Sequence, residues 1–317
     1  LELRIETEKD FGLPCLSLDR VNLGDRLLQL KVMEKTGLNK KQLENMKSPA
    51  NYVDLEKVIF PWIKFESPIL QKKLTDMKNQ HNVSPGRKGY INTFMFGEMK
   101  VTIGVGGIHG DNGTCIIKPN EDELLLDSDV NSLYPSLMRM YHLYPPKLKN
   151  VLGQIFPQII DDRLEFKRTG QKNKNETYKY MLNGVSGKMQ DETSWLFSPF
   201  TVMQVRINGQ LLLLMLAERL LKLGCKLYQI NTDGILYKLK KSKYEELQQV
   251  LKEWEKLTML TLETEEFTQF YQLAINDYFG VEPNNKIKKK GFFLTDIELG
   301  KGPSKTQFNL AQTAQPR

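Results

Sequence analysis

Two aspartates at the ends of apolar segments could carry out phosphoryl-transfer chemistry. Asp129 closes the run LLLDSD at 124–129, and Asp233 lies in the turn 231–234. Carboxylates at the ends of neighbouring strands can hold two magnesium ions, which activate an attacking hydroxyl and stabilise a leaving pyrophosphate. Each residue also has a plainer interpretation: Asp129 as a helix cap and Asp233 as a turn residue.

A basic pair of helices could supply phosphate ligands. Arg163 and Lys167 are four residues apart, and so are Lys179 and Asn183. Positions i and i+4 share a helix face, so two such helices in a hairpin would direct Arg163, Lys167 and Lys179 at one triphosphate. The spacing leaves open the alternative of a solvated basic helix pair.

The elements that position these residues follow from the apolar pattern. We expect helices at 25–36 (ended by Gly37), 132–141, 158–169, 176–189, 205–223 (ended by Gly224) and 243–256. We expect strands around 93–105, 114–118, 124–129, 227–230, 235–239, 258–264 and 270–278. Five glycines within 104–113 should separate the first two strands, and Asp-Gly should turn a hairpin at 227–239. This order predicts an α+β fold with an antiparallel sheet as its core.

Composition narrows the class of protein. The 317 residues carry 45 basic and 38 acidic side chains, a net charge of +7 that suits a polyanionic partner. Three cysteines and three histidines are scattered, which argues against a zinc site or a disulfide framework and favours a reducing compartment. The longest apolar run, 211–217, is too short for a membrane helix, and the first residues lack a signal peptide. We therefore expect a protein of a reducing compartment without a membrane partner.

Several motifs resemble those of family B DNA polymerases. DVNSLYPSL at 129–137 is similar to motif A, especially in phage and protein-primed members. KYMLNGVSGK at 179–188 resembles motif B (KxxxNSxYGK), and YQINTDG at 228–234 resembles motif C (YxDTDS). Gly106 and Gly107 resemble the YxGG-type element, and IKKKG at 287–291 resembles the late lysine motif. Three motifs in the family's order, across 104–291, carry the resemblance.

The resemblance implies a polymerase palm, an antiparallel sheet with helices on one face, together with a two-helix fingers insertion and a mostly helical N-terminal segment. The implied division is 1–91 as the segment linking exonuclease and palm, 92–156 as the first palm part, 157–190 as fingers, 191–300 as the second palm part and 301–317 as a loose tail. The composition of residues 84–89 predicts a turn-rich linker. No exonuclease motif is evident, the tail is too short for a full thumb, and the first residue is Leu, so we expect a fragment of a longer polymerase.

The resemblance also implies residue roles. Asp129, Asp233 and the carbonyl of Val130 would hold two Mg²⁺ ions, for which Mn²⁺ could substitute. The incoming deoxynucleoside triphosphate would contact Val130, Asn131, Ser132, Leu133, Tyr134, Arg163, Lys167, Lys179 and Asn183, with backbone amides of 131–134 at the phosphates. Tyr134 would lie under the deoxyribose and exclude a ribose 2′-OH. Primer–template DNA would contact Gly106, Gly107, Lys288 and Lys290, the lysines near the primer terminus.

The implied activity is DNA-directed addition of deoxynucleotides to a primer 3′-OH in phage replication, inside the bacterial cytoplasm, with a terminal protein or accessory factors as further partners. Four positions depart from the motifs: Asn231 replaces Asp, Gly234 and Gly184 replace Ser, and Ser186 replaces Tyr. Two alternatives stay open: a palm enzyme that makes or copies RNA, and a truncated or degenerate polymerase that binds DNA without turnover.

Overall fold

The computed structural model describes residues 2–86 and 89–291. Its helices are α1 (Glu2–Phe11), α2 (Arg20–Thr36), α3 (Lys40–Glu44), α4 (Leu55–Val58), α5 (Pro68–Lys78), α6 (Leu133–Met140), α7 (Lys149–Arg168), α8 (Lys172–Gln190), α9 (Pro199–Leu223) and α10 (Tyr244–Thr258). The predicted tail 301–317 and residues 292–300 of the predicted second palm part lie outside the described residues.

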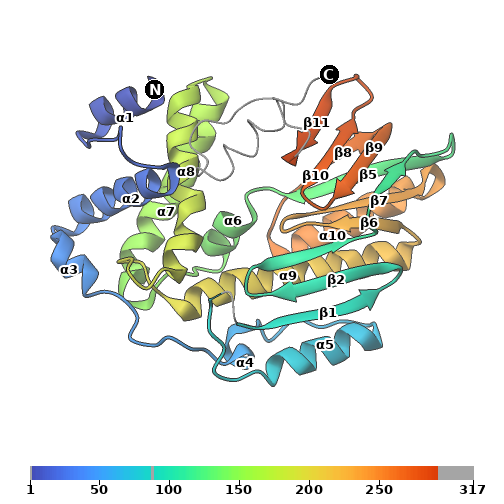
Figure 1. Cartoon of the computed structure of the whole chain (residues 1–317), viewed down its shortest axis with the longest axis horizontal. Coiled ribbons are helices and arrows are strands. Elements are labelled where there is room, and N and C mark those ends of the chain that lie inside the picture. Colours follow the sequence, from blue (N-terminus) through green and yellow to red (C-terminus); the bar gives the residue numbers. More distant parts are fainter. Residues whose placement is uncertain (1, 87–88, 292–317) are drawn as a thin grey trace, which may run out of the picture.

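A seven-stranded sheet forms the centre of the larger half of the molecule (Figure 1). Its strands are β1 (Ile91–Phe96), β2 (Met99–Gly104), β3 (Gly107–Asp111), β5 (Glu123–Val130), β6 (Lys226–Ile230), β7 (Gly234–Lys240) and β8 (Leu262–Phe267). The order is β1-β2-β3-β6-β7-β5-β8, and every neighbouring pair is antiparallel. The prediction of an α+β fold built on an antiparallel sheet is therefore confirmed.

A second, four-stranded sheet covers part of the first. It consists of β11 (Ile287–Lys290), β10 (Asp277–Val281), β9 (Gln269–Ala274) and β4 (Cys115–Ile117), all antiparallel. Phe270 and Tyr278 of this sheet pack with Leu125 and Leu236 of the large sheet in a separate apolar cluster. Since β11 carries the lysine motif, this packing fixes where the lysines lie.

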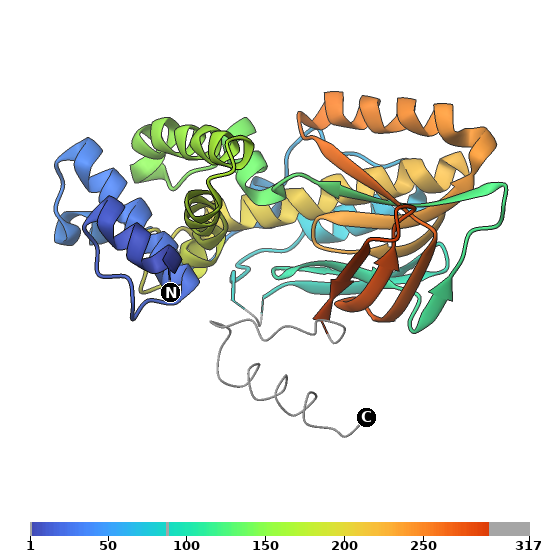
Figure 2. The ribbon, with the colours of Figure 1, turned by 90° about the horizontal axis from the view of Figure 1, so that it is seen from above.

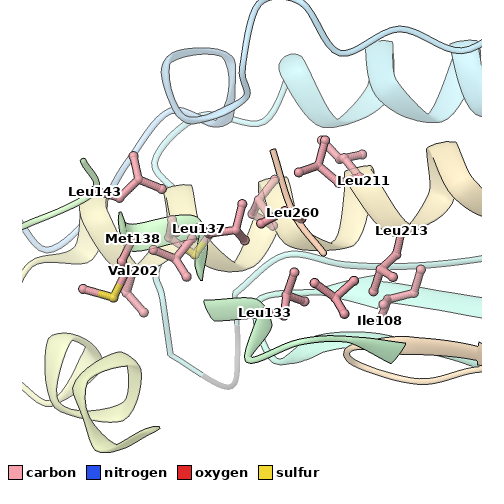
Figure 3. Packing of buried hydrophobic residues seen from close by; sticks show 14 of the residues in the cluster. Ile108, Leu133, Leu137, Met138, Leu143, Val202, Leu211, Leu213 and Leu260 are labelled. Atoms are coloured by element: carbon pink, nitrogen blue, oxygen red, sulfur yellow. The ribbon is translucent and has the colours of Figure 1, made fainter. Parts of the chain in front are cut away.

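Helix α9 is the axis of the main core. It contacts α10, α6 and α8 as well as β3, β6 and β7, and Figure 2 shows α9 and α10 together on one side of the large sheet. Leu133, Leu137 and Met138 of α6 lie along α9, as Figure 3 shows. The buried indole of Trp254 on α10 donates a hydrogen bond to the Leu212 carbonyl (2.9 Å). The site below is therefore built on a rigid helix.

By length and composition alone, α9 could also cross a membrane. However, 83% of its most apolar stretch is buried inside the protein. Such a helix is typical of the core of a globular protein, so the expectation of no membrane partner stands as a prediction.

Some element boundaries differ from those predicted. Helix α7 begins at Lys149 instead of 158 because Pro157, typical of a first helical turn, lies inside the helix. It therefore crosses the expected boundary at 156/157, and the domain division itself stays a prediction. Helix α9 begins at Pro199 and α2 at Arg20, where Asp19 caps the helix through the backbone N–H of Asn22. Both predicted glycine caps, Gly37 and Gly224, adopt the left-handed conformation.

Three strand predictions were wrong. The glycine-rich stretch does not separate the strands, because Gly107–Asp111 itself forms β3 and pairs with β2. The segment 258–264 finishes α10 before β8 starts at Leu262. The segment 270–278 is not one strand but the hairpin of β9 and β10. A turn with neither proline nor glycine, at Ile275 and Asn276, gave no signal for this hairpin.

Candidate active site

The two predicted aspartates meet at one edge of the large sheet. Asp129 on β5 lies opposite Gly234 on β7, and the backbone N–H of Val130 donates to the Asp233 carbonyl (2.7 Å). Burial and, after it, the charge of Asp129 raise the pKa of Asp233. Two carboxylates that repel one another at one sheet edge favour a divalent cation between them. The pairing of β5 with the β6–β7 hairpin thus joins residues 104 positions apart.

The Asp129 carboxylate occupies the space that a side chain at Gly234 would fill. A Cβ built on Gly234 would lie 1.7 Å from Oδ1 of Asp129, so this carboxylate crosses the backbone of its neighbour. Asn231, the other departure in this turn, accepts a hydrogen bond from the N–H of Thr232 at its side-chain oxygen (3.1 Å), while its own N–H donates to the Gly234 carbonyl (2.8 Å). Asn231 therefore shapes the turn that presents Asp233.

A cavity of about 360 Å³ opens beside Asp233, and we call it the aspartate cavity. It is lined by Ser132, Leu133, Tyr134, Pro135, Arg163, Lys179, Asn183, Thr232 and Asp233. Six of these were predicted to bind the nucleotide and one to be catalytic. The structure therefore brings the start of α6, the two basic helices and the β6–β7 turn to one space.

The contacts of the basic residues in the aspartate cavity differ. Arg163 is half-buried; its Nη1 donates to the Ser132 hydroxyl (3.2 Å), whereas its buried Nε has no partner among the described residues. Lys179 lies 3.3 Å from Glu176, one turn earlier on α8. A forked guanidinium and a point-charged ammonium facing one cavity suit a polyphosphate.

Three predicted nucleotide contacts do not line this cavity. Lys167 is exposed, one turn beyond Arg163 on α7. Val130 is buried in the sheet. The backbone N–H of Asn131 donates to the Thr261 carbonyl (2.9 Å), and its side-chain amide donates to Glu263 (3.1 Å). The Asn131 amide is therefore engaged with β8 and its flank, not directed at the cavity.

Close backbone contact holds α8 in place. A Cβ on Gly24 of α2 would lie 2.2 Å from the Tyr180 carbonyl oxygen, so only glycine allows the two helices to approach this closely. Lys188 lies 3.8 Å from Asp25, and the Trp195 indole donates to the same carboxylate (2.9 Å). These contacts fix the helix face that carries Lys179 and Asn183.

The lysine motif lies on the other side of Asp129. The Lys288 ammonium contacts Asp127 (3.1 Å), Asp129 (3.1 Å) and Glu265 (2.9 Å). Burial and next the charge of Asp129 raise the pKa of Asp127 to about 6, against the opposing effect of Lys288. Burial alone lowers the pKa of Lys288, but the two aspartates outweigh burial and the net direction is upward. Lys288 therefore screens the acids that flank the site.

Asp127 and Glu265 were missed in the sequence. The D-x-D spacing at 127–129 places two carboxylates on one face of β5, which was the available signal. Glu265 lies opposite Asp127 on β8, a pairing that only the fold reveals. Lys290 lies over the Tyr278 ring, with Nζ 5.8 Å from the ring centroid, and its charge lowers the pKa of Asp233. The primer-terminus role of the two lysines stays a prediction.

Gly106 lies in the turn between β2 and β3, and Gly107 is the first residue of β3, beside a second cavity of about 490 Å³. This glycine cavity is lined by Tyr90, Ile91, Thr102, Gly104, Val105, Gly106, Gly107, His109, Tyr134, Gln190, Arg206 and Thr232. Tyr134 and Thr232 line both cavities, so the two spaces adjoin.

The donor set suits magnesium with few protein ligands. Within the described ranges, no group of three or more His, Cys, Asp or Glu side chains is arranged around one metal position. Mg²⁺ usually keeps several waters and binds through one or two carboxylates together with substrate phosphates. The mutually repelling pair fits that mode, with Asp129 half-buried on β5 and Asp233 exposed in the turn, and the aspartate cavity offers room for the phosphates.

Comparison with known proteins gives a distant likeness in fold. No protein-family model matches the chain, and no curated protein matches it. Among solved structures, it resembles the family B DNA polymerase from the hyperthermophilic archaeon Pyrobaculum calidifontis, with 14% identity and a TM-score of 0.41. The match covers 63% of this chain and 33% of the polymerase, so the chain spans about a third of that protein. The function proposed below rests on this chain's own residues.

Proposed function

We propose that the chain is a DNA-directed DNA polymerase that adds deoxynucleotides to a primer 3′-OH with two divalent ions. One observation carries the proposal: Asp129 and Asp233 share a sheet edge that opens into a cavity lined by Arg163 and Lys179. Carboxylates for cations on one side and fixed positive charges for phosphates on the other are the elements that phosphoryl transfer requires.

The proposal gives each residue a task. Asp129, Asp233 and the Val130 carbonyl would hold Mg²⁺ or Mn²⁺. When bound, the ions would supply positive charge for the primer oxygen and the leaving pyrophosphate. Arg163 and Lys179 would orient the triphosphate, so that little covalent chemistry is left to the protein. Lys288, with its three carboxylate contacts, would set the position of Asp129.

Tyr134 forms the wall between the two cavities. Its ring packs on α9, where a Cβ on Gly209 would lie 3.6 Å from Tyr134 Cε1. An aromatic ring held in this way gives a flat, rigid surface for the sugar of an incoming nucleotide. We therefore assign sugar discrimination to Tyr134 as part of the proposal.

Primer extension with magnesium and deoxynucleotides tests the proposal. The parent chain should extend a primer, and Asp233→Asn should reduce the rate by at least about 10²–10³-fold, the order expected for one preorganised charged group. Asp122→Asn is the matched control, because the Asp122 side chain is 67% exposed in the turn before β5. Extension that survives Asp233→Asn would mean that the chemistry lies elsewhere.

DNA binding without extension, in parent and variants alike, would instead support the alternative of a polymerase that does not turn over. Extension with ribonucleotides in preference to deoxynucleotides would support the RNA-making alternative. Phage replication in a bacterial cytoplasm belongs to the proposal on the form of the motifs alone.

A further inference from the structure

One face of α8 runs past both cavities. Lys179 and Asn183 line the aspartate cavity, Ser186 follows one turn later, and Gln190 lines the glycine cavity. The spacings of four, three and four residues keep these side chains on one side of the helix. If the aspartate cavity takes a nucleotide, the glycine cavity is where the base paired with it would lie.

Arg206 of α9 is fixed at the wall of the glycine cavity. Its Nε donates to the Ser186 hydroxyl (3.1 Å), and Nη2 donates to the Ser186 carbonyl (3.2 Å). Its Nη1 donates to Gln190 Oε1 (2.6 Å) and to the Val105 carbonyl (3.3 Å). These bonds use four of the five guanidinium N–H groups, so within the described residues one N–H on Nη2 is left for a ligand.

The same cavity presents other polar atoms that lack partners. The Tyr134 hydroxyl and Nδ1 of His109 are buried without a hydrogen bond among the described residues. Thr232 completes the wall towards Asp233. Because burying an unpaired polar group costs about 1–3 kcal/mol, such atoms point to a ligand with both donors and acceptors. A nucleobase edge has both.

Ser186, which accepts two hydrogen bonds from Arg206, is one of the two positions that depart from motif B. The Ser186 hydroxyl and the Ser186 backbone carbonyl both accept from Arg206, and a tyrosine at position 186 would lack the first of these acceptors at that place. Ser186 is buried, and its small side chain lets the guanidinium reach the cavity wall. The substitution and the arginine therefore form one structural unit.

We propose that Arg206, held by Ser186, contacts the nascent base pair and discriminates correct pairs from mismatches. The inference rests on the proposed polymerase function. A copying enzyme must accept all four base pairs, so a useful contact has to be independent of sequence. The minor-groove edge offers this, because purine N3 and pyrimidine O2 are acceptors in every pair. A fixed donor meets these acceptors in a correctly shaped pair and loses them in a distorted one.

Single-nucleotide insertion kinetics test this role. We would measure kcat/KM for the complementary and for each mismatched deoxynucleotide. Arg206→Gln should reduce the ratio of correct to incorrect insertion about tenfold or more, as expected for one hydrogen bond from a charged donor. Ser186→Ala removes one support of the guanidinium and should reduce the ratio in the same direction by a smaller factor. If Arg206→Gln does not fold, Ser186→Ala and Arg206→Lys carry the test.

Arg219→Gln is the matched control. Arg219 lies on the same helix, 13 residues beyond Arg206, which corresponds to about 20 Å. The control should keep the parent ratio. A second readout needs no turnover: 2-aminopurine placed as the templating base should change fluorescence on binding the parent, and Arg206→Gln should diminish that change.

The outcomes separate this inference from the proposed function. Extension with an unchanged discrimination ratio in Arg206→Gln would overturn the inference and leave the polymerase assignment intact. Loss of thermal stability with unchanged discrimination would show that Arg206 only holds α8 and the turn after β2 against α9. A parent chain that neither binds nor extends primer–template would overturn both.

Discussion

Two regions of this molecule differ in whether their buried polar groups have hydrogen-bond partners. Around α9 they are paired: Asn208 accepts from the Phe60 N–H and donates to the Val58 carbonyl, and Gln210 bonds both the N–H and the carbonyl of Gly104. At the two cavities, the Tyr134 hydroxyl, His109 Nδ1 and Arg163 Nε have no partner among the described residues.

The difference separates scaffold from site. A buried polar group contributes to stability when it is paired and costs about 1–3 kcal/mol when it is not. The paired polar groups around α9 hold this helix to β2 and α4. The unpaired polar groups at the cavities would gain hydrogen-bond partners only when a ligand binds. Changes in the scaffold should therefore alter stability, and changes at the cavities should alter activity.

The largest effect on stability is expected for Trp254→Ala. The indole is fully buried and bonded to Leu212, so its removal should lower the free energy of unfolding by about 3–5 kcal/mol. Urea denaturation measures the loss, and Tyr244→Ala, on the exposed side of the same helix, should change it by much less. Equal losses for the two variants would contradict the role of α9 and α10 as scaffold.

Arg163→Met should show the opposite pattern. Losing a charged donor to the triphosphate should raise the KM for deoxynucleotides about 10–100-fold, which corresponds to about 1.5–3 kcal/mol. Unfolding stability should stay within about 1 kcal/mol, because the one hydrogen bond that Arg163 donates among the described residues goes to the Ser132 hydroxyl. The control is Arg168→Met on the exposed face of α7, paired with Glu165. A matching rise in KM for that control would argue for a general charge effect.

The same change, tyrosine to phenylalanine, can be made at a paired and at an unpaired buried hydroxyl. Tyr237→Phe removes a hydroxyl that is bonded to Ser128 (2.8 Å), and it should cost about 0.5–1.5 kcal/mol of stability. Tyr134→Phe removes a hydroxyl without a partner among the described residues, and it should leave stability unchanged or slightly higher. Urea midpoints of both variants provide the measurement. A loss at position 134 as large as that at 237 would break the distinction.

The smallest effect concerns pH. Burial raises the folded-state pKa of Asp25 above 3.8, so this carboxyl lowers stability as pH rises through its folded pKa. A hydrogen bond from Lys57 and another from the Asn82 backbone lower the pKa of Asp54, so its contribution is lost as pH falls. From acidic to neutral pH, Asp25→Asn should therefore gain stability relative to the parent, and Asp54→Asn should lose it. Slopes of the same sign would contradict these environments.

The motif residues could be placed from the sequence because their elements carry strong local signals. Asp-Gly specifies the β6–β7 hairpin, and the apolar run at 124–129 specifies β5. The antiparallel pairing of these strands then brings Asp129 and Asp233 together. The α+β class follows from the same order of elements.

Other features depend on long-range pairing that spacing does not encode. The second sheet joins β4 to strands more than 150 positions later, and it brings Lys288 onto Asp127 and Asp129. Pro157 continues α7 where local propensity predicts a start. Arg206 gave no motif signal, because its contacts come from α8 and from the end of β2.

The most direct test of the central claim is templated single-nucleotide addition. Four primer–templates that differ only in the templating base are each incubated with one deoxynucleotide at a time, with and without Mg²⁺. We predict extension by one nucleotide only in the four complementary combinations and only with the metal. Extension that ignores the templating base, or none in any combination, would contradict the assignment of Asp129, Asp233 and the aspartate cavity to DNA synthesis.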